Sequence, residues 1–359
     1  MDYLRLKEYG LSDRFAQEAA LYDGLFLARV SEQHRDLYKV IGEQGELQAG
    51  VSGKLAYQAG GSGDFPAVGD WVMIDRIDNN TGNAVIHHIL QRKSVFERKA
   101  AGTSNTIQII AANIDIVFIC MSLNADFNLR RLERYLSIAW NSMATPVIVL
   151  TKADLCADLS QRLAEISTVS VGTDVVVCSS LEDNGYQQVV SYLTKGKTIA
   201  FIGSSGVGKS TLINRLLGRD VLVTKDIRED DDKGRHATTH RQLLLLPQGG
   251  IVIDTPGMRE LQLDSGNLSK CFEDVADLAA RCKYQDCSHT AEPDCAVRRA
   301  IEAGELPRER FENYLKLQKE IGYEGLNSRQ LEQEKIKRMF GSMGEMKQAM
   351  KHVKNKNKR

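Results

Sequence analysis

Apolar and polar positions alternate in short stretches through the first quarter of the chain. Five of these stretches, separated by turn residues, predict strands at Gly24–Val30, Leu37–Ile41, Glu46–Tyr57, Val68–Ile74 and Asn83–Leu90. Gly60–Gly63 and Asn79–Gly82 supply turns between them, the second as a hairpin loop. Five short strands within about 70 residues predict a small β-barrel, and their number and size fit an OB-fold or an SH3-like barrel equally well.

From about residue 105 the pattern changes to continuous Val/Ile/Leu runs that alternate with amphipathic segments. The apolar runs predict strands at Ile114–Met121, Pro146–Leu150, Asp174–Cys178, Thr198–Ile202, Gln242–Leu246 and Ile251–Asp254. The amphipathic segments predict helices at Leu129–Asn141, Leu159–Ile166, Tyr186–Leu193 and Lys209–Leu217. Strands that are apolar throughout are typical of a parallel sheet buried on both faces, so an α/β domain is expected here. After about residue 266 only helical segments are predicted.

One strand-to-helix junction carries a phosphate-binding motif. Residues 203–210 read G-S-S-G-V-G-K-S, which matches G-x-x-x-x-G-K-[ST] between an apolar strand and an amphipathic helix. In such a loop the backbone N–H groups surround a β-phosphate, Lys209 reaches the β- and γ-phosphates, and the Ser210 hydroxyl ligates Mg²⁺. The residues predicted to bind the nucleotide here are Gly203, Ser204, Ser205, Gly206, Val207, Gly208, Lys209, Ser210 and Thr211.

A second apolar strand ends in Asp254-Thr255-Pro256-Gly257, a D-x-x-G motif downstream of the phosphate loop. Asp254 is placed to hold Mg²⁺ through water, and the Gly257 N–H is placed to meet a γ-phosphate. Between the two motifs, either Thr238 or Thr239 can supply a second hydroxyl to the Mg²⁺ ion. Thr239 is favoured for this role.

A third motif predicts which base is bound. Thr151-Lys152-Ala153-Asp154 ends a predicted strand and resembles the N/T-K-x-D motif of GTPases. The Asp154 carboxylate can accept bidentately from guanine N1–H and N2–H₂, and the Lys152 stem covers the base. Ser179 and Ser180, at the end of the next strand, resemble the element that contacts guanine O6. GTP is therefore the predicted nucleotide; the alternative, a P-loop ATPase or kinase with a small substrate, predicts that ATP competes well with GTP.

The base-reading motifs precede the phosphate loop, whereas in ordinary GTPases they follow it. Such a circular permutation leaves the pocket intact, because the binding loops all emerge at the carboxyl ends of parallel strands. Met258 follows the D-x-x-G motif, where many GTPases place a glutamine that orients the attacking water. His236 is the best internal candidate for that role, and an exposed loop histidine is the alternative. His236 and Lys209 are thus the predicted catalytic residues.

Four potential metal ligands follow the α/β region within 14 residues: Cys282, Cys287, His289 and Cys295. The spacing C-x₄-C-x-H-x₅-C supplies three thiolates and one imidazole. Three Cys and one His form a complete tetrahedral set for Zn²⁺ with no open position, so a single structural zinc ion is predicted.

Composition and charge place the chain among ordinary soluble proteins, with 47 Lys+Arg, 47 Asp+Glu and 42% hydrophobic residues. The longest apolar stretches are far shorter than the ~20 residues that span a bilayer. The N-terminus lacks the apolar core of a secretion signal, so a cytoplasmic protein is expected. The neutral net charge hides an asymmetry: Lys335–Arg359 contains nine Lys and Arg against one acid, Glu345. This tail is either an arm attracted to nucleic acid or a solvated tail.

Together these motifs resemble the circularly permuted, small-ribosomal-subunit-dependent GTPase family (RsgA/YjeQ). The resemblance runs from about Gly24 to about Tyr323 and includes V-G-D-W-V at 68–72, N-L-R-R-L-E-R-Y-L at 128–136, the phosphate loop, G-R-H-x-T-T, D-T-P-G, and the Cys/His motif followed by Ala296-Val297. Thr151 departs from the asparagine that is more common there, and Ala237 departs from a threonine. A catalytic role for His236 is implied by this resemblance as well as by its position.

The resemblance implies a multidomain α/β protein with an N-terminal β-barrel (OB-fold), a circularly permuted P-loop GTPase domain and a C-terminal helical zinc-binding domain. The expected divisions are an N-terminal extension (1–23), an OB-fold RNA-binding domain (24–104), the GTPase domain (105–265), the zinc-binding domain (266–334) and the basic tail (335–359). The implied partner is the 30S subunit with its 16S rRNA, bound late in its maturation, which stimulates hydrolysis of GTP to GDP. A monomer that binds no membrane is expected. The alternative is a nucleotide-gated RNA-binding module in which hydrolysis is incidental.

Overall fold

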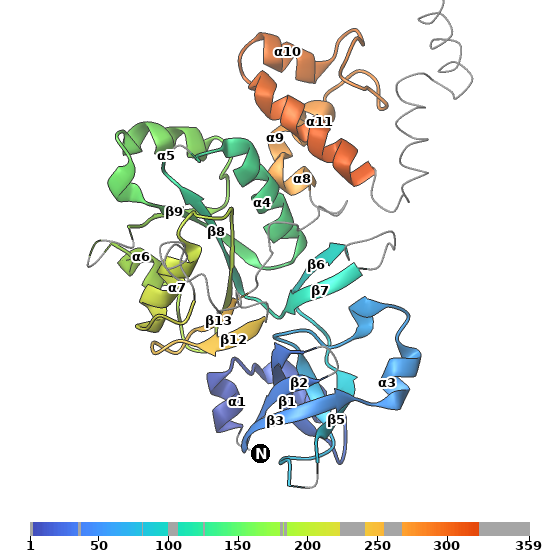
Figure 1. Ribbon diagram of the computed structural model, residues 1–359. Coiled ribbons are helices and arrows are strands. Elements are labelled where there is room, and N and C mark those ends of the chain that lie inside the picture. The colour runs from blue at the N-terminus through green and yellow to red at the C-terminus, as the bar shows by residue number, and fades with distance from the viewer. Residues whose placement is uncertain are drawn as a thin grey trace, which may run out of the picture.

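The computed structural model describes residues 3–34, 37–80, 82–99, 107–124, 126–179, 182, 185–222, 241–254 and 268–322. A β-barrel near the N-terminus is followed by an α/β region and then by a group of C-terminal helices (Figure 1). None of the helices among these residues combines the length and the apolar character that crossing a membrane requires.

The barrel is built from β1 (Phe26–Gln33), β2 (Tyr38–Gly42), β3 (Gly45–Val51), β4 (Trp71–Ile74) and β5 (Ala84–Ile89). β1 pairs with both β2 and β4, and β3 runs parallel to β5, so the strand order is β1-β2-β3-β5-β4 and back to β1. A helix, α3 (Gly53–Gln58), lies between β3 and β4 along the chain. This closed order is that of an OB-fold and decides against an SH3-like barrel.

The predicted strand Glu46–Tyr57 is wrong over its second half. β3 ends at Val51, and α3 begins directly afterwards. Ser52 causes the change, because its side-chain oxygen accepts a hydrogen bond from the Leu55 N–H (3.1 Å) and so caps the helix.

Two short N-terminal helices, α1 (Leu4–Glu8) and α2 (Asp13–Ala19), contribute to the core of the barrel region. Leu6 and Phe15 are buried in one apolar cluster with Trp71 of β4. The segment expected to be an N-terminal extension therefore packs as part of this folded region.

An antiparallel ribbon of β6 (Val95–Lys99) and β7 (Ile107–Ala112) connects the barrel to the α/β region. The hydrophobic pattern did not predict these two strands. The ribbon lies on both sides of the expected boundary at residues 104 and 105. Phe96 and Ile110 are buried in the main core of the α/β region, so the ribbon is joined to that region by packing.

Among its described residues, the α/β region contains five parallel strands: β8 (Ile116–Ser122), β9 (Thr145–Thr151), β10 (Asp174–Val177), β11 (Thr198–Ile202) and β13 (Ile251–Asp254). Their order is β10-β9-β8-β11-β13. β12 (Gln242–Leu245) is antiparallel to β13 and also pairs with β1 of the barrel. The expectation of a parallel strand is therefore wrong for β12. The short turn between β12 and β13, closed by the Leu246 N–H to the Gly250 oxygen (2.7 Å), permits only an antiparallel pair.

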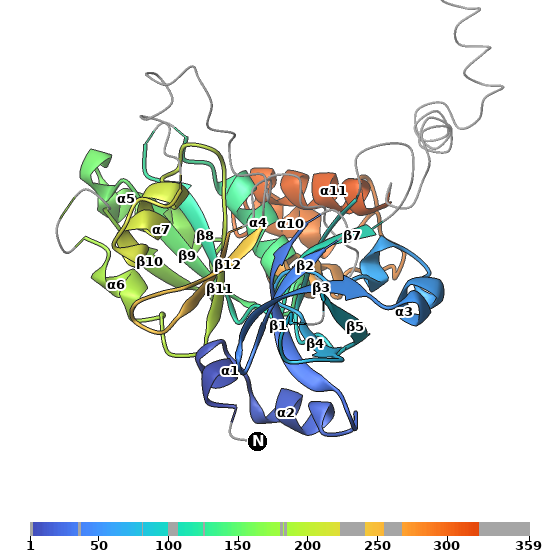
Figure 2. The same ribbon diagram turned by 60° about the horizontal axis from the view of Figure 1, so that its bottom comes forward.

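Helices cover both faces of this sheet (Figure 2). Val117 and Ile119 of β8 pack with α4 (Leu129–Asn141) and α5 (Leu159–Ser167) on one face. Phe118 and Cys120, the alternate residues of the same strand, pack with α6 (Gln187–Val190) and α7 (Lys209–Leu217) on the other. The carboxyl ends of the parallel strands consequently share one edge of the sheet, where connecting loops can form a binding site.

The C-terminal helices are α8 (Leu268–Cys271), α9 (Glu273–Ala279), α10 (Ala296–Glu302) and α11 (Arg308–Gly322). This group packs against α4 through α8 and α11. Phe272 and Phe311 join the apolar core on the α4 side of the sheet. At the centre of the contact, the Glu133 carboxylate of α4 accepts hydrogen bonds from Arg310 and Asn313 of α11.

Candidate nucleotide site and metal centre

The phosphate loop joins β11 to α7 at the carboxyl edge of the sheet. Gly203 has a φ of 144°, and a Cβ at this position would lie 2.3 Å from the Cys120 carbonyl oxygen of β8. Gly208 precedes the first residue of α7 and has a φ of 97°, in the left-handed region. Both positions require glycine, the first because the backbones approach closely and the second because of its dihedral angle.

Lys209 lies over its own loop. Its Nζ donates to the carbonyl oxygens of Gly203 (2.7 Å) and Ser204 (2.6 Å). Ser210 and Thr211 follow in the first turn of α7 and are partly buried. The predicted phosphate-binding residues are therefore gathered around the start of one helix, where N–H groups and the helix dipole favour an anion.

Asp254 ends β13, the neighbour of β11, and so reaches the same edge of the sheet. Burial raises the pKa of Asp254 to about 6, although the Lys209 ammonium opposes the shift. A serine hydroxyl and a carboxylate at one site are hard oxygen ligands of the kind that Mg²⁺ prefers. Ser210 and Asp254 thus fit the predicted magnesium site.

The loop after β9 contacts the phosphate loop directly. The buried Thr151 hydroxyl donates to the carbonyl oxygen of Val207 (2.5 Å) and lies 3.3 Å from that of Met121. Lys152 adopts a left-handed conformation with φ 57°, which turns the chain beyond the end of β9. The segment predicted to bind the base is thereby fixed to the segment predicted to bind phosphates.

The Asp154 carboxylate is exposed and is oriented by Ser179. The Ser179 hydroxyl donates to Asp154 Oδ1 at 2.7 Å, and the Ala153 N–H donates to the Cys178 carbonyl oxygen at 3.3 Å. These bonds join the loops after β9 and β10. Lone pairs of the oriented carboxylate stay open to solvent, as recognition of guanine N1–H and N2–H₂ requires.

Several predicted site residues lie outside the described residues. They are Ser180, His236, Thr238, Thr239, Gly257 and Met258, together with the basic tail 335–359. Their roles stay predictions.

Arg131 of α4 was not among the predicted nucleotide-site residues, yet it contacts the phosphate loop. Its Nη1 donates to the Ser204 hydroxyl (2.7 Å) and to both carboxylate oxygens of Asp126 (2.8 and 2.9 Å). The sequence does contain a signal, because Arg130 and Arg131 fall in the first turn of a predicted helix, where the helix dipole disfavours cations.

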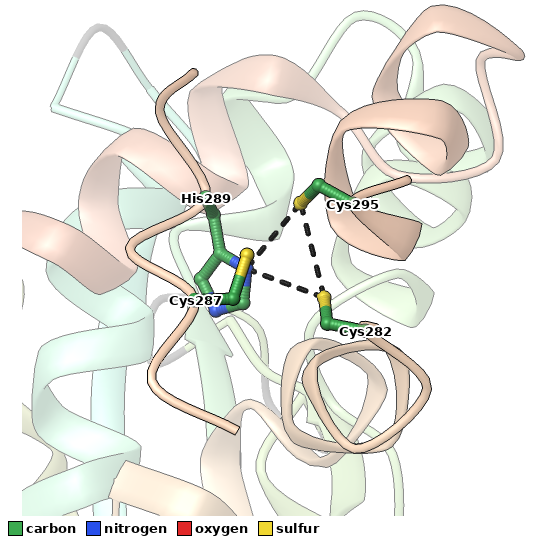
Figure 3. Close-up of side chains that lie close together, drawn as sticks. All are labelled: Cys282, Cys287, His289 and Cys295. Carbon is green, nitrogen blue, oxygen red and sulfur yellow. Dashed lines mark hydrogen bonds between the residues drawn. The ribbon is translucent and has the colours of Figure 1, made fainter. Parts of the chain in front are cut away.

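The predicted metal ligands converge on one point in the C-terminal helical group (Figure 3). Cys282, Cys287, His289 and Cys295 each offer one ligand atom, and these atoms all lie within 4.8 Å of one another. The Sγ atoms of Cys282 and Cys295 are 3.8 Å apart, and His289 Nδ1 lies 3.5 and 3.4 Å from them. A tetrahedron with Zn–S of ~2.3 Å and Zn–N of ~2.0 Å has edges of roughly 3.8 and 3.5 Å, so Cys282, His289 and Cys295 already have the spacing of a zinc site, and Cys287 completes the set of four ligands.

The Cys/His cluster lies where an irregular segment meets the C-terminal helices. Cys295 is the N-cap of α10 and its Sγ accepts from the Arg298 N–H at 3.5 Å. The His289 ring lies edge-on to Phe311 of α11, with centroids 6.0 Å apart. A metal bound here would therefore stabilise the packing of α10 and α11 and carry no reaction.

Comparison with known sequences finds relatives along nearly the whole chain. The RsgA GTPase family profile matches residues 89–264. Small ribosomal subunit biogenesis GTPase RsgA 2 of Lactiplantibacillus plantarum is 56% identical over 353 residues, covering 98% of this chain and 98% of that protein. The corresponding RsgA 1 of Listeria monocytogenes is 44% identical over 320 residues, covering 89% of this chain and 90% of its own length.

Comparison with solved structures gives two similar folds. YjeQ from Thermotoga maritima aligns with a TM-score of 0.61 and 27% identity, covering 83% of this chain and 98% of that one. YloQ, described as a circularly permuted GTPase, aligns with a TM-score of 0.59 and 23% identity, covering 84% and 96%. The second likeness concerns the fold alone.

Proposed function

The chain belongs to the RsgA GTPase family, and from this we propose that it binds GTP and hydrolyses it to GDP and phosphate during biogenesis of the small ribosomal subunit. The predicted fold class, an OB-fold barrel, a circularly permuted GTPase domain and a C-terminal helical domain with a Cys₃His cluster, is confirmed. The observation that carries the proposed activity is a pair of side-chain bonds: the Ser179 hydroxyl orients the Asp154 carboxylate, and the Thr151 hydroxyl ties the end of β9 to the phosphate loop.

The base and the phosphates of the nucleotide are expected to bind to different loops. Asp154, held by Ser179, accepts the guanine N–H groups, and the amides of residues 203–211 receive the phosphates. Lys209 then exchanges its bonds to the Gly203 and Ser204 oxygens for bonds to the β- and γ-phosphates. The nucleotide thus replaces two bonds that Lys209 makes within its own loop.

Hydrolysis is proposed as in-line attack of water on the γ-phosphorus, with cleavage of the bond to the β-phosphate oxygen. Ser210, Asp254 and Thr239 are the proposed holders of Mg²⁺, an ion that neutralises charge on the phosphate oxygens when bound. Lys209 and the loop amides stabilise the same charge. His236 is proposed to orient the attacking water, because methionine at position 258 offers no strong hydrogen bond for that purpose.

The proposed structural metal is Zn²⁺, one ion per chain. Support comes from the ligand set and its convergence, since three thiolates and an imidazole gathered within 4.8 Å are typical of closed zinc sites.

We further propose the 30S subunit and its 16S rRNA as partners of a cytoplasmic monomer. The relatives' names refer to the small ribosomal subunit. A cavity of about 410 Å³ on the barrel supports an RNA contact: it is lined by residues of the β1–β2 loop and β2, such as His34 and Lys39, with Gln48 of β3 and Asn79 of the β4–β5 loop. These are the strands and loops with which OB-folds bind oligonucleotides.

The deciding experiment measures GTP and ATP hydrolysis by the purified chain, with and without purified 30S subunits. GTP-selective turnover that the subunits accelerate supports the activity and the partner. Turnover without any effect of 30S would remove the partner from the proposal, and equal use of ATP would favour the P-loop ATPase or kinase alternative.

An Asp154→Asn variant provides the matched control. Loss of two charge-assisted hydrogen bonds to guanine should weaken GTP use by about a hundredfold or more. Xanthosine triphosphate should be used better by this variant than by the parent chain, because the asparagine N–H₂ can donate to the C2 carbonyl of xanthine. Gain of activity with that base shows that the variant is folded.

A further inference from the structure

Arg131 occupies a position that local physics disfavours. It lies in the first turn of α4, which holds two arginines and no acidic residue. Cations in a first turn face the positive end of the helix dipole. A residue that its local structure disfavours is found chiefly where a functional contact compensates for the cost. The tertiary partners of Arg131 are therefore candidates for such a contact.

The partners of Arg131 link α4 to the phosphate loop. One nitrogen atom, Nη1, donates to both oxygens of Asp126 and to the Ser204 hydroxyl, at 2.7 to 2.9 Å. Asp126 lies just before α4, in the segment whose Asn128 side chain caps the helix by accepting from the Arg131 N–H at 3.0 Å. The guanidinium is therefore held from one side by its own loop, and it holds Ser204 from the other.

Two oxygen atoms of Ser204 are bound by cations. Its hydroxyl meets Arg131, and its carbonyl oxygen accepts from Lys209. When Lys209 turns to the phosphates of a bound nucleotide, the bonds to Gly203 and Ser204 end. The contact with Arg131 uses a different atom of Ser204 and does not depend on Lys209, so it persists.

We propose that Arg131 is a positioning residue of the phosphate site. Through the Ser204 hydroxyl it keeps the first half of the phosphate loop in the shape that receives the β-phosphate after Lys209 has left the loop carbonyls. Thr151 holds the second half of the loop through Val207. Asp126 fixes the guanidinium. This inference rests on the proposed function and extends it to a residue of α4.

Replacement of Arg131 by alanine should weaken ground-state binding and spare the chemical step. The KM for GTP and the dissociation constant of fluorescently labelled GDP should both rise about tenfold, since a hydrogen bond to a charged group is lost. GDP and GTP should be affected alike because both present the β-phosphate. The turnover number should change by no more than about twofold. Arg131 contacts the phosphate loop and does not contact the reacting atoms.

Three further variants separate this role from a loss of folding. Arg131→Lys should restore most of the affinity, because all three contacts come from a single nitrogen and an ammonium carries three donors. Ser204→Ala should reproduce the loss, and the double variant should be no weaker than either single one. Arg76→Ala is the control: Arg76 is similarly exposed and pairs with Asp75 in the barrel, so nucleotide binding should be unchanged.

Three results would overturn the proposed role of Arg131. Unchanged GDP affinity in Arg131→Ala, or additive effects of the Arg131 and Ser204 substitutions, overturns the inference. A fall in turnover number with unchanged KM also overturns it, because the arginine would then act on the transition state. Binding of labelled GDP by the parent chain is measured first. If the parent chain does not bind it, the proposed function itself fails.

Discussion

The Thr151 hydroxyl lies 2.5 Å from the carbonyl oxygen of Val207, across 56 positions of sequence. One residue ends a strand of the base-reading side and the other lies in the phosphate loop. Thr151 is 1% exposed, so water cannot replace the bond if it is lost. A threonine hydroxyl therefore links the two halves of the proposed nucleotide site.

Thr151→Val, which keeps the shape and removes the hydroxyl, should lower both stability and nucleotide affinity. An unpaired buried carbonyl costs about 1–3 kcal/mol, so the free energy of unfolding should fall by that amount. GDP affinity should fall as well, because the phosphate loop loses the bond that fixes Val207. Titration with labelled GDP measures the affinity and thermal unfolding measures the stability. Thr151→Ser keeps the hydroxyl and should behave nearly as the parent chain; equal loss in both variants would show that the methyl group matters and the hydrogen bond does not.

Asp254 makes the stability of the nucleotide-free, magnesium-free chain depend on pH. Burial raises the pKa of Asp254 to about 6, above the ordinary 3.8. The folded chain then holds a proton that the unfolded chain has released, so this stabilisation is fully present below pH ~4 and is lost as the pH rises through 6. Relative to Asp254→Asn, the parent chain should lose up to about 3 kcal/mol between pH 4 and 8. Urea unfolding of both chains across this range measures the difference between their free energies of unfolding. A difference that stays constant with pH would show that the pKa of Asp254 is not raised.

Glu133 should be essential for docking of the C-terminal helices on α4. Its carboxylate is 0% exposed and accepts from Arg130, Arg310 and Asn313. Glu133→Ala removes one carboxylate partner of the buried Arg310, which keeps its pair with Asp274, so the free energy of unfolding should fall by about 2–3 kcal/mol. Trp140 of α4 packs under the Lys270 ammonium of α8 at 4.4 Å, so its fluorescence can follow urea unfolding at this contact.

A surface pair on α5 supplies the control for Glu133. Arg162 and Glu165 are 2.9 Å apart, with side chains 40% and 31% exposed. Glu165→Ala should cost less than about 1 kcal/mol, because exposed ion pairs contribute little. Similar losses in the two variants would contradict the importance of the buried contact.

Metal analysis should find one zinc ion per chain, held by the Cys₃His cluster. Cys282→Ser and Cys295→Ser should each lose the ion and loosen the packing of α10 and α11, seen as faster proteolysis of this region. Cys156→Ser is the matched control, since Cys156 is half-buried and belongs to no ligand cluster among the described residues. Full zinc content in Cys295→Ser would contradict the prediction that Cys295 is a zinc ligand.

The hydrophobic pattern and the motifs by themselves predicted the order of the regions, the strands of the α/β domain, the glycine-rich loop between β11 and α7, and which residues form the Cys/His cluster. This was possible because each depends on residues close together in sequence: a loop that wraps a phosphate needs its glycines and lysine within eight positions, and the Cys/His cluster spans 14 residues. The predicted strand ends also brought Asp154 and Ser179 to the same edge of the sheet, because the carboxyl ends of parallel strands meet there.

The tertiary structure alone decided what depends on pairing between distant segments. Five alternating strands do not say which edges join, so only the β1–β4 and β3–β5 pairings identified the OB-fold. The turn to helix after Ser52 and the antiparallel direction of β12 likewise followed from caps and hairpins that periodicity does not register. Arg131 with Ser204 and Glu133 with Arg310 are 73 and 177 positions apart. Such contacts depend on how buried surfaces pack, and a linear pattern of polarity carries no information about which charged side chains will meet.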